Sequence, residues 1–415
     1  MKPLSLVQIL LYSTGNLGAN LVYAFANFAF PLFLSAYSIP HMLVGFLAQE
    51  RSFVGGFVQP VVGAVSDRLP PNPLGRRRPF FLVGVPLTAA SLIFLSTYPP
   101  LWAVVATMTV FSFFLAVASD PYLALMPDIS PPRQRGRIGG VMAVFSMLGQ
   151  VVVLFLSFLL WERHQAALFW LVAGGMILSF AITFFSIQEP PIQPRQRERR
   201  RTHFKLAATS YIRDLLARQQ VVRYLLCNLF FWLGNGGIAP FVTRFAVDVL
   251  GVDQDEAFLL VLPAILGSAL FAVPAGLLTE RYGKKAVLNV GMLGFGAMAI
   301  VGGLGVSTVP QAVVMMAMVG VANAITTALI FPLLADLIPG DRAGELTGVG
   351  AMVWSVSQTL GALGAGAMAD ATGTLRGAFA LGGAFMLVAF AILLTVRTDL
   401  PSAATLPAPA GTGER

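Results

Sequence analysis

The segment GAVSDRLPPNPLGRRRPF, residues 63–80, is the most informative about the fold, because its pattern returns later in the chain as GLLTERYGKK, residues 276–285. Each copy has a glycine, then an acid and an arginine, then a second glycine and a run of cations. Long apolar segments flank both copies, so each is predicted to be a short basic loop between two membrane helices. The pattern residues are Gly63, Asp67, Arg68, Gly75, Arg76, Arg77 and Arg78 in the first copy, and Gly276, Glu280, Arg281, Gly283, Lys284 and Lys285 in the second.

The repeat extends well beyond these loops. Gly75 and Gly283 are 208 residues apart. The same separation relates Asp128 to Asp336, Pro131 to Pro339, Gly136 to Gly344, Gly140 to Gly348, and Gln150 to Gln358. A separation kept over such a length predicts an internal duplication, with two six-helix halves related by an axis along the membrane normal.

The composition is that of a membrane protein. Hydrophobic residues make up 56% of the chain and charged residues only 11%, whereas soluble domains carry about 25% charged residues. The 415 residues suit about a dozen spans of about 20 residues with short connections. We therefore expect an all-α integral membrane protein, with twelve transmembrane helices in two six-helix pseudo-symmetric bundles.

The apolar segments divide the chain into four parts. These are an N-terminal six-helix bundle at 1–187, a cytoplasmic basic linker at 188–221, a C-terminal six-helix bundle at 222–396 and a disordered cytoplasmic tail at 397–415. The expected helices cover residues 6–37, 41–65, 79–97, 101–126, 138–160, 166–187, 222–245, 257–278, 286–306, 310–334, 346–368 and 375–396.

The positive charge is unevenly distributed over the predicted loops. Of the 27 Lys and Arg residues, 23 fall on one set of alternating loops and tails. Arg163, Arg244 and Arg376 fall on the opposite set, and Arg51 lies within a span. Positive loops stay in the cytoplasm, so both termini are expected there and the protein is expected to cross the cell membrane many times. The basic face suits anionic lipid, and no nucleic-acid partner is expected.

No metal or cofactor is expected. The chain has one cysteine, Cys227, so neither a disulfide nor a cysteine-based metal site can form within it. The three histidines, His41, His164 and His203, fall in loops or at a helix boundary, and no nucleophile–base pair accompanies them. A membrane enzyme is thus disfavoured. We expect a monomer whose partners are a small solute and the lipid bilayer.

The first predicted helix carries a stripe of neutral polar side chains. Asn16, Asn20, Tyr23 and Asn27 are spaced by 4, 3 and 4 residues, which places them on one helix face. Donors and acceptors without charge are what a neutral polyol such as a sugar needs. The alternative is that these groups form hydrogen bonds between helices.

Polar residues recur in the second half. In the seventh helix, Asn228, Trp232 and Asn235 again have spacings of 4 and 3, and three glycines and Pro240 interrupt the backbone. Interrupted helices at matching positions in two halves indicate a binding site near the membrane midplane. Trp232 could stack on a sugar ring or serve only in packing. The remaining candidates are Gln150, Asn323, Trp354 and Gln358.

Three ionisable residues fall within predicted spans: Glu50, Arg51 and Asp120. A charge inside a membrane costs on the order of 3 kcal/mol, so each needs a partner or a function. A carboxylate in a cavity of low dielectric constant can gain and lose a proton near neutral pH. Proton coupling through Asp120 or Glu50 and a structural ion pair are both open interpretations.

The charges of the two basic loops are candidates for a cytoplasmic gate. Asp67 and Glu280 lie at the predicted inner ends of their helices, near several cations. Such pairs are individually weak, so their predicted role is to bias an equilibrium between two conformations.

The loop pattern resembles that of the major facilitator superfamily (MFS), where it occurs between helices 2 and 3 and again between helices 8 and 9. The segments Ile39-Pro40-His41, Gln59-Pro60, Ser66-Asp67-Arg68 and Gly75-Arg76-Arg77-Arg78-Pro79-Phe80 look like those of sucrose/H+ symporters and the wider glycoside–pentoside–hexuronide symporter group. PYLALMPD at residues 121–128, with Arg135-Gly136-Arg137, is similar to the same group. This resemblance implies proton-coupled uptake of a disaccharide or related glucoside.

The chain departs from that group at two positions. The membrane aspartate that the group uses for proton coupling aligns with Ser112, and an acid near the outer end of helix 7 aligns with Arg244. The resemblance therefore leaves Asp120 or Glu50 as substitutes, or implies uncoupled transport.

The sequence thus predicts a secondary transporter that moves a small neutral solute, such as sucrose or maltose, by alternating access with proton symport. Two alternatives within or near that class are a proton-driven exporter of drugs or metabolites and a transport-dead solute sensor. The amide stripe favours the sugar carrier over the exporter.

Overall fold

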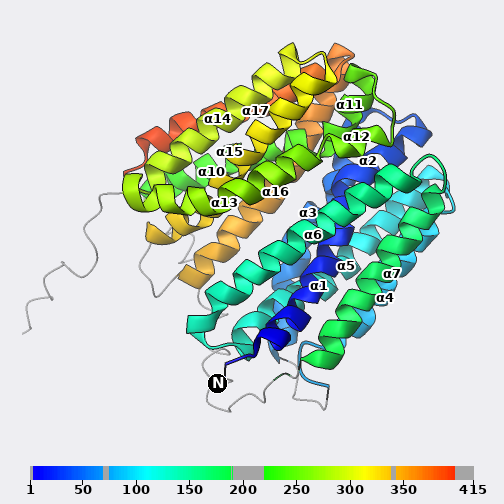
Figure 1. The fold of residues 1–415 in the computed structure, drawn as a ribbon, viewed down its shortest axis with the longest axis vertical. Helices are drawn as coiled ribbons and strands as arrows, with labels where there is room; N and C mark the ends of the chain where they lie inside the picture. Colours follow the sequence, from blue (N-terminus) through cyan, green and yellow to red (C-terminus); the bar gives the residue numbers. More distant parts are fainter. Residues whose placement is uncertain (1–2, 69–73, 188, 190–218, 338–342, 398–415) are drawn as a thin grey trace, which may run out of the picture.

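The computed structural model describes residues 3–68, 74–187, 189, 219–337 and 343–397 (Figure 1). Most of the expected linker and all but the first residue of the expected tail lie outside these ranges. In the described part of the chain every regular element is a helix.

The N-terminal half contains six spans. The first is composite: α1 (Leu6–Ala24) continues through a π-helical turn (Phe25–Ala29), α2 (Phe30–Phe33) and a 3-10 turn (Leu34–Tyr37). The other five are α3 (His41–Arg68), α4 (Pro79–Leu95), α5 (Leu101–Ile129), α6 (Arg135–Leu160) and α7 (Gln165–Ser186).

The C-terminal half repeats this arrangement. Its first span joins α10 (Gln219–Ile238), a 3-10 turn (Ala239–Phe241) and α11 (Val242–Leu250), and its second joins α12 (Glu256–Leu259) and α13 (Leu262–Tyr282). The others are α14 (Lys284–Gly305), α15 (Val309–Asp336), α16 (Ala343–Thr372) and α17 (Leu375–Thr395).

In the described part of the chain the helices form twelve successive spans, which confirms the predicted fold class. Nine described segments are both long and apolar enough to qualify by composition. The other three are α3, α4 and α16. Helix α3 carries Glu50 and Arg51 in its middle, and α4 is apolar but has only 17 residues.

The first span of each half is interrupted beside a proline. In the N-terminal half the π-helical turn ends one residue before α2, which contains Pro31. In the C-terminal half the 3-10 turn contains Pro240. Proline lacks an amide hydrogen and removes one bond of the α-helical pattern, which contributes to both breaks.

The two halves pack by the same scheme. In the N-terminal half α1 packs on α6 and α7, α5 packs on α3 and α4, and α4 packs on α7. In the C-terminal half α10 packs on α16 and α17, α15 packs on α13 and α14, and α14 packs on α17. The equivalent helices are thus α1 and α10, α3 and α13, α4 and α14, α5 and α15, α6 and α16, and α7 and α17.

Both basic loops turn at an equivalent glycine. Gly75 has φ +92° and Gly283 has φ +82°, a region that favours glycine because it lacks a Cβ. In the first loop a Cβ on Gly75 would lie 2.7 Å from Oε2 of Glu189. That same oxygen accepts hydrogen bonds from the backbone N–H groups of Arg76 (2.7 Å) and Arg77 (2.8 Å).

The cations after each glycine bind the ends of neighbouring helices in the same half. Arg76 and Arg77 contact Asp128 near the end of α5, at 2.8 and 3.0 Å. At the equivalent positions Lys284 contacts Asp336 at the end of α15, at 2.7 Å. These contacts hold helix ends together within one bundle.

The next cation in each loop binds helix C-terminal carbonyl groups, where a positive charge is favourable. Arg78 donates to the carbonyl of Phe184 in α7 and lies over its ring, 4.3 Å from the centroid. Lys285 donates to the carbonyls of Leu394 and Val396 at the end of α17, at 3.2 and 2.6 Å.

The halves contact one another mainly along α3 and α16, and at the end of the molecule where α2, α11 and α12 lie. The two bundles lie closest there and further apart toward the end marked N (Figure 1). The approach of α3 and α16 depends on small residues, as expected for helices in lipid. A Cβ on Gly45 would lie 2.5 Å from the carbonyl of Ala362, and one on Gly366 would lie 2.5 Å from that of His41.

The repeated ion pair allows a matched test of stability. Asp128 is 22% exposed and faces two buried arginines, whereas Asp336 is 51% exposed and faces one lysine that is 40% exposed. Removing one partner of a buried pair leaves an uncompensated charge. We therefore expect Asp128→Asn to destabilise the protein by about 2 kcal/mol, allowing for its partial exposure.

Asp336→Asn, at the equivalent position, is expected to cost less than about 1 kcal/mol because its pair is exposed. Thermal unfolding of both variants in one detergent would measure the difference. Equal loss of stability in the two variants would contradict this account of the loops.

Candidate functional site

A cavity between the two halves brings together most of the polar residues singled out from the sequence. It has two chambers that share Gln150, Asn235 and Ala239 as lining residues. We call the chamber beside α1 and α3 the charged chamber; its volume is about 320 Å³. We call the other, bounded by α13 and α15, the neutral chamber; its volume is about 460 Å³. Together they form the central cavity, and each is within the size range of small-molecule sites.

The polar stripe of the first helix divides between cavity and packing. Asn20, Tyr23 and Asn27 line the charged chamber. Asn16 does not line either chamber; its Nδ2 donates to the carbonyl of Met142 in α6, at 2.7 Å. Both of the alternatives stated for this stripe therefore occur on the same helix.

The seventh helix divides in the same way. Asn235 lines both chambers. Asn228, two turns earlier, is buried and donates to the carbonyl of Tyr224 at 2.9 Å. Asn16 and Asn228 are 212 residues apart, as are Tyr12 and Tyr224. Each of these tyrosines donates to a backbone carbonyl within its own half.

Two tryptophans meet at the edge of the charged chamber. Trp354 lines the chamber, and the buried Trp232 packs behind it with ring centroids 5.6 Å apart. In the described structure neither indole N–H has a hydrogen-bond partner. Trp354 is thus the ring that can face a solute, and Trp232 supports it.

Gln358 connects the two halves inside the cavity. Its Oε1 accepts a hydrogen bond from Ser52 of α3 at 3.0 Å, and its Nε2 donates to Asn235 at 3.3 Å. Its repeat partner Gln150 lines both chambers. Asn323 lines the neutral chamber with Ser268, 3.4 Å away.

Several lining residues were not predicted from the sequence. Gln49, Ser52 and Gln59 of α3 line the charged chamber. Their spacings of 3 and 7 residues place them on one helix face, a signal that the sequence carried. Ser355 of α16 also lines this chamber.

Arg51 contributes a cation to the charged chamber. Its guanidinium lies over the Tyr23 ring, 4.6 Å from the centroid, and donates to Oδ1 of Asn27 at 3.2 Å. Among the described residues it forms no ion pair, and its Nε has no hydrogen-bond partner. A ring face and an amide oxygen stabilise this charge without neutralising it.

The two acids predicted for proton coupling occupy different places. Asp120 lines the charged chamber, and its Oδ2 has no hydrogen-bond partner among the described residues. Glu50 is buried and lines neither chamber. Ser112, at the aligned position of the group's coupling aspartate, lines the same chamber as Asp120.

The remaining predicted gate residues lie near the ends of α3 and α13. Gly63, Asp67 and Arg68 lie in the last two turns of α3, and the side chains of Asp67 and Arg68 lie outside the described part of the structure. Gly276 is in α13, and Glu280 and Arg281 near its end are exposed. The gate role of this set stays a prediction.

A charged cluster that the sequence did not reveal joins the two halves at the start of α3, at the end of the molecule opposite the basic loops. Asp370 of α16 accepts hydrogen bonds from the backbone N–H groups of His41 (2.8 Å) and Met42 (3.0 Å) at the start of α3. Its Oδ1 also lies 2.9 Å from the His41 ring. Asp248 lies 3.9 Å from the same ring and 3.4 Å from Arg244. A carboxylate of one half thus caps a helix of the other.

Comparison with known proteins agrees with this architecture. The family model described as MFS/sugar transport protein matches residues 11–341. An uncharacterized MFS-type transporter of Methanocaldococcus jannaschii, MJ1317, is 20% identical over 280 residues, which is 65% of this chain and 65% of that protein. The chain thus spans just under two thirds of that relative. Another, YfnC of Bacillus subtilis, is 22% identical over 353 residues, or 83% of this chain and 82% of the relative.

Solved structures share the fold at low sequence identity. The nucleoside transporter NupG has a TM-score of 0.78 at 10% identity, covering 94% of this chain and 99% of its own. A D-xylose-proton symporter has a TM-score of 0.71 at 14% identity, covering 94% and 97%. These likenesses extend to the fold alone.

The Asp370 contacts predict a shift in conformation on mutation. Asp370→Asn removes the carboxylate that holds the start of α3, and hydrogen bonds to charged groups contribute about 1.5–3 kcal/mol. Because Asp370 is partly exposed, we expect about 1.4 kcal/mol, which is roughly a tenfold shift toward a conformation open at this end.

Distances between spin labels would measure that shift. Labels at Ser38→Cys and Ala371→Cys, in a Cys227→Ala background, report on the two halves at this end. The control is the same labelled pair with Asp370 retained. An unchanged distance distribution in Asp370→Asn would show that these contacts do not hold the end closed.

Proposed function

We propose that this chain, which belongs to the MFS/sugar transport protein family, is a secondary transporter rather than an enzyme, and that its solute is a small neutral sugar, such as a disaccharide or glucoside. The observation that supports this proposal is the lining of the central cavity. Side-chain amides from both halves face it, namely Asn20, Asn27, Gln49, Gln59, Gln150, Asn235, Asn323 and Gln358.

An amide offers both a donor and an acceptor, and a sugar hydroxyl needs both. A buried polar group of the site left without a partner is costly, so such a lining selects a solute with many hydroxyls. Trp354 adds an aromatic face against which the apolar side of a sugar ring can pack.

The solute would cross by alternating access. In this structure the two halves are joined by hydrogen bonds at the end near His41 and Asp370. We propose that this end faces outward and that the basic loops face the cytoplasm, because positive loops stay inside. Rocking of the two bundles about the central cavity would then expose the solute to each side in turn.

Proton coupling is proposed at Asp120 rather than Glu50. Each acid has one carboxylate oxygen without a hydrogen-bond partner among the described residues. Asp120 lines the chamber that the solute would enter, whereas Glu50 lines neither chamber. Arg51 lines the same chamber as Asp120. We propose that Arg51 stabilises the deprotonated Asp120 through space, and that proton binding to Asp120 precedes solute binding in each cycle.

Uptake of labelled sucrose and maltose into proteoliposomes, with and without an inward proton gradient, tests this function. We expect a gradient to drive accumulation. Asp120→Asn is expected to abolish gradient-driven accumulation but to retain exchange of solute across the vesicle membrane, because the binding amides are unchanged. Glu50→Gln is the matched control and should retain both activities if it folds.

Each contrary outcome has a definite meaning. Loss of coupling in Glu50→Gln but not in Asp120→Asn would contradict the assignment of Asp120. Gradient-independent uptake would remove proton symport and keep the sugar. Uptake of labelled uridine but neither sugar would favour a nucleoside, a solute with similar hydroxyls, and dye export would favour the exporter.

Two asparagines of one helix provide a test of the binding site. Asn235→Ala removes an amide that lines both chambers, and we expect KM to rise about tenfold, as for the loss of a hydrogen bond of about 1.4 kcal/mol. Asn228→Ala, two turns away and outside the cavity, should leave KM unchanged even if the protein is less stable. Equal changes of KM in the two variants would contradict the proposed site.

A further inference from the structure

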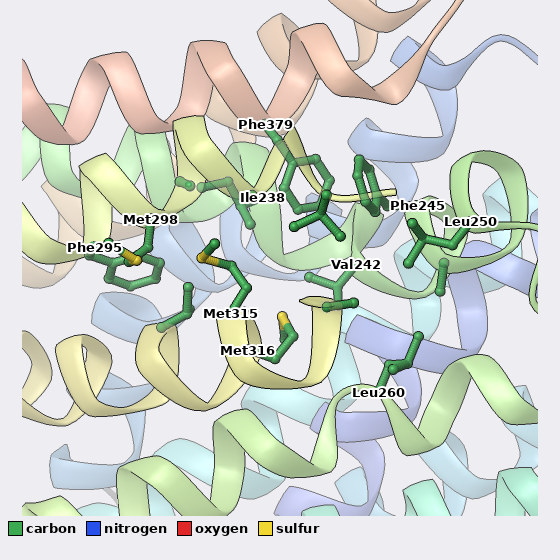
Figure 2. Close-up of a pocket in the computed structure, with 16 residues that line it drawn as sticks. Ile238, Val242, Phe245, Leu250, Leu260, Phe295, Met298, Met315, Met316 and Phe379 are labelled. Atoms are coloured by element: carbon green, nitrogen blue, oxygen red, sulfur yellow. The ribbon is translucent and has the colours of Figure 1, made fainter. Parts of the chain in front are cut away.

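A second cavity inside the C-terminal bundle has no polar side chain in its walls. Its volume is about 70 Å³, and it lies among α10, α11, α14, α15 and α17. Side chains from these helices point toward one another around it, among them Ile238, Phe295, Met315 and Phe379 (Figure 2). We call it the apolar side cavity.

The apolar side cavity adjoins the neutral chamber. The residues that line both are Ile238, Val242, Phe295, Met316 and Val319. On one side of these residues lie the polar groups of the neutral chamber, including Asn235 and Asn323. On the other side every lining residue is apolar. A molecule that occupied both spaces would have a polar part and an apolar part.

The repeat shows that the fold does not require this space. Val319 of α15 is equivalent to Phe111 of α5, at the separation of 208 residues. Phe111 is 1% exposed and is one of the largest fully buried side chains, whereas Val319 is only partly buried and faces the space between the two cavities. The buried Val104 is likewise equivalent to the smaller Ala312, which lines the apolar side cavity.

The two halves pack their helices in the same way, but at these equivalent positions the C-terminal half has smaller side chains and a cavity. A void in a packed interior costs free energy because its lining loses contacts. Not every substitution removes volume, since Met315 replaces Thr107. Methionine is flexible and polarizable, so it can close on ligands of different shape. Three methionines, Met298, Met315 and Met316, line the apolar side cavity.

From these observations we infer that the transported solute carries an apolar substituent, which occupies the apolar side cavity while its sugar binds in the neutral chamber. The ligand class is a glycoside with a short alkyl aglycone. This inference rests on the proposed function, because it assigns a second part to the solute of the same site. We favour a glycoside over a lipid chain as the occupant, because a lipid chain would make no use of the amides in the adjoining neutral chamber.

The volume limits the substituent. A cavity of about 150 Å³ with similar walls can hold benzene, and the apolar side cavity is smaller than that. A chain of a few carbons is therefore expected to fill it. Each methylene group buried from water can raise affinity up to about fourfold, so the gain should rise with chain length and stop when the space is full.

Binding of methyl, butyl and hexyl β-D-glucosides to the full-length protein in nanodiscs, followed by isothermal titration calorimetry, tests the inference. We expect hexyl glucoside to bind at least about tenfold more tightly than methyl glucoside. Ala299→Leu places a larger side chain in the apolar side cavity and should remove this gain while methyl glucoside binds as before. Val301→Leu, on the exposed face of the same helix, is the matched control and should keep the gain.

A second variant changes the cavity in the other direction. Met315→Ala enlarges the space, so the chain length at which the gain stops should increase. This result would support the inference even if Ala299→Leu did not fold. No dependence on chain length in the unmodified protein would overturn the inference and leave the sugar assignment intact.

Other outcomes separate the two proposals. A gain for hexyl glucoside that persists in both Ala299→Leu and Val301→Leu would come from partition into lipid and would overturn the inference. Failure of all three glucosides to bind, together with no uptake of sucrose or maltose, would overturn the sugar proposal and the inference with it. Binding of 1-hexanol without any glucoside would assign the apolar side cavity to a lipid chain instead.

Discussion

In a lipid membrane every backbone N–H and C=O group needs a hydrogen-bond partner within the protein, and the whole structure depends on this constraint. Helices meet that need within one segment, so each of the twelve spans is a helix. The first span of each half is interrupted, beside Pro31 and Pro240. Both interrupted spans contribute to the central cavity, Asn27 in the π-helical turn and Ala239 in the 3-10 turn. The same constraint that forces regular helices thus makes their few irregular turns suitable places for a binding site.

The two basic loops stabilise their bundles in the same way, although the residues that make the contacts differ between the two copies. Both loops contain a glycine with positive φ. In both, one cation binds an acid at the end of α5 or α15, and a second cation binds the C-terminal carbonyl groups of another helix. In the N-terminal copy two buried arginines and Glu189 strengthen the arrangement. In the C-terminal copy the described residues show one ion pair, between the exposed Lys284 and Asp336. Each loop holds its own bundle together, which allows a bundle to move as one body.

Asymmetry between the halves is as informative as their symmetry. Helices α3 and α16 pack closely, whereas the equivalent pair, α13 and α6, makes only a limited contact. Arg51 and Asp120 are both in the N-terminal half, and the apolar side cavity is in the C-terminal half. The central cavity therefore has a charged side and a neutral side, divided near Gln150 and Asn235. A solute with distinct parts would bind such a cavity in one orientation.

The sequence alone determined the membrane fold, the number of helices and the duplication, because composition, hydropathy and a separation of 208 residues are properties of the chain itself. It also indicated more than half of the polar residues that line the cavity, since helical spacing places side chains on one face. It could not separate Asn20 from Asn16, or Asn235 from Asn228, because which part of a face meets a cavity depends on neighbouring helices. The pairing of His41 with Asp370 and the apolar side cavity were also decided only by the tertiary structure. Both arise between segments far apart in the chain, where packing, not spacing, determines which atoms meet.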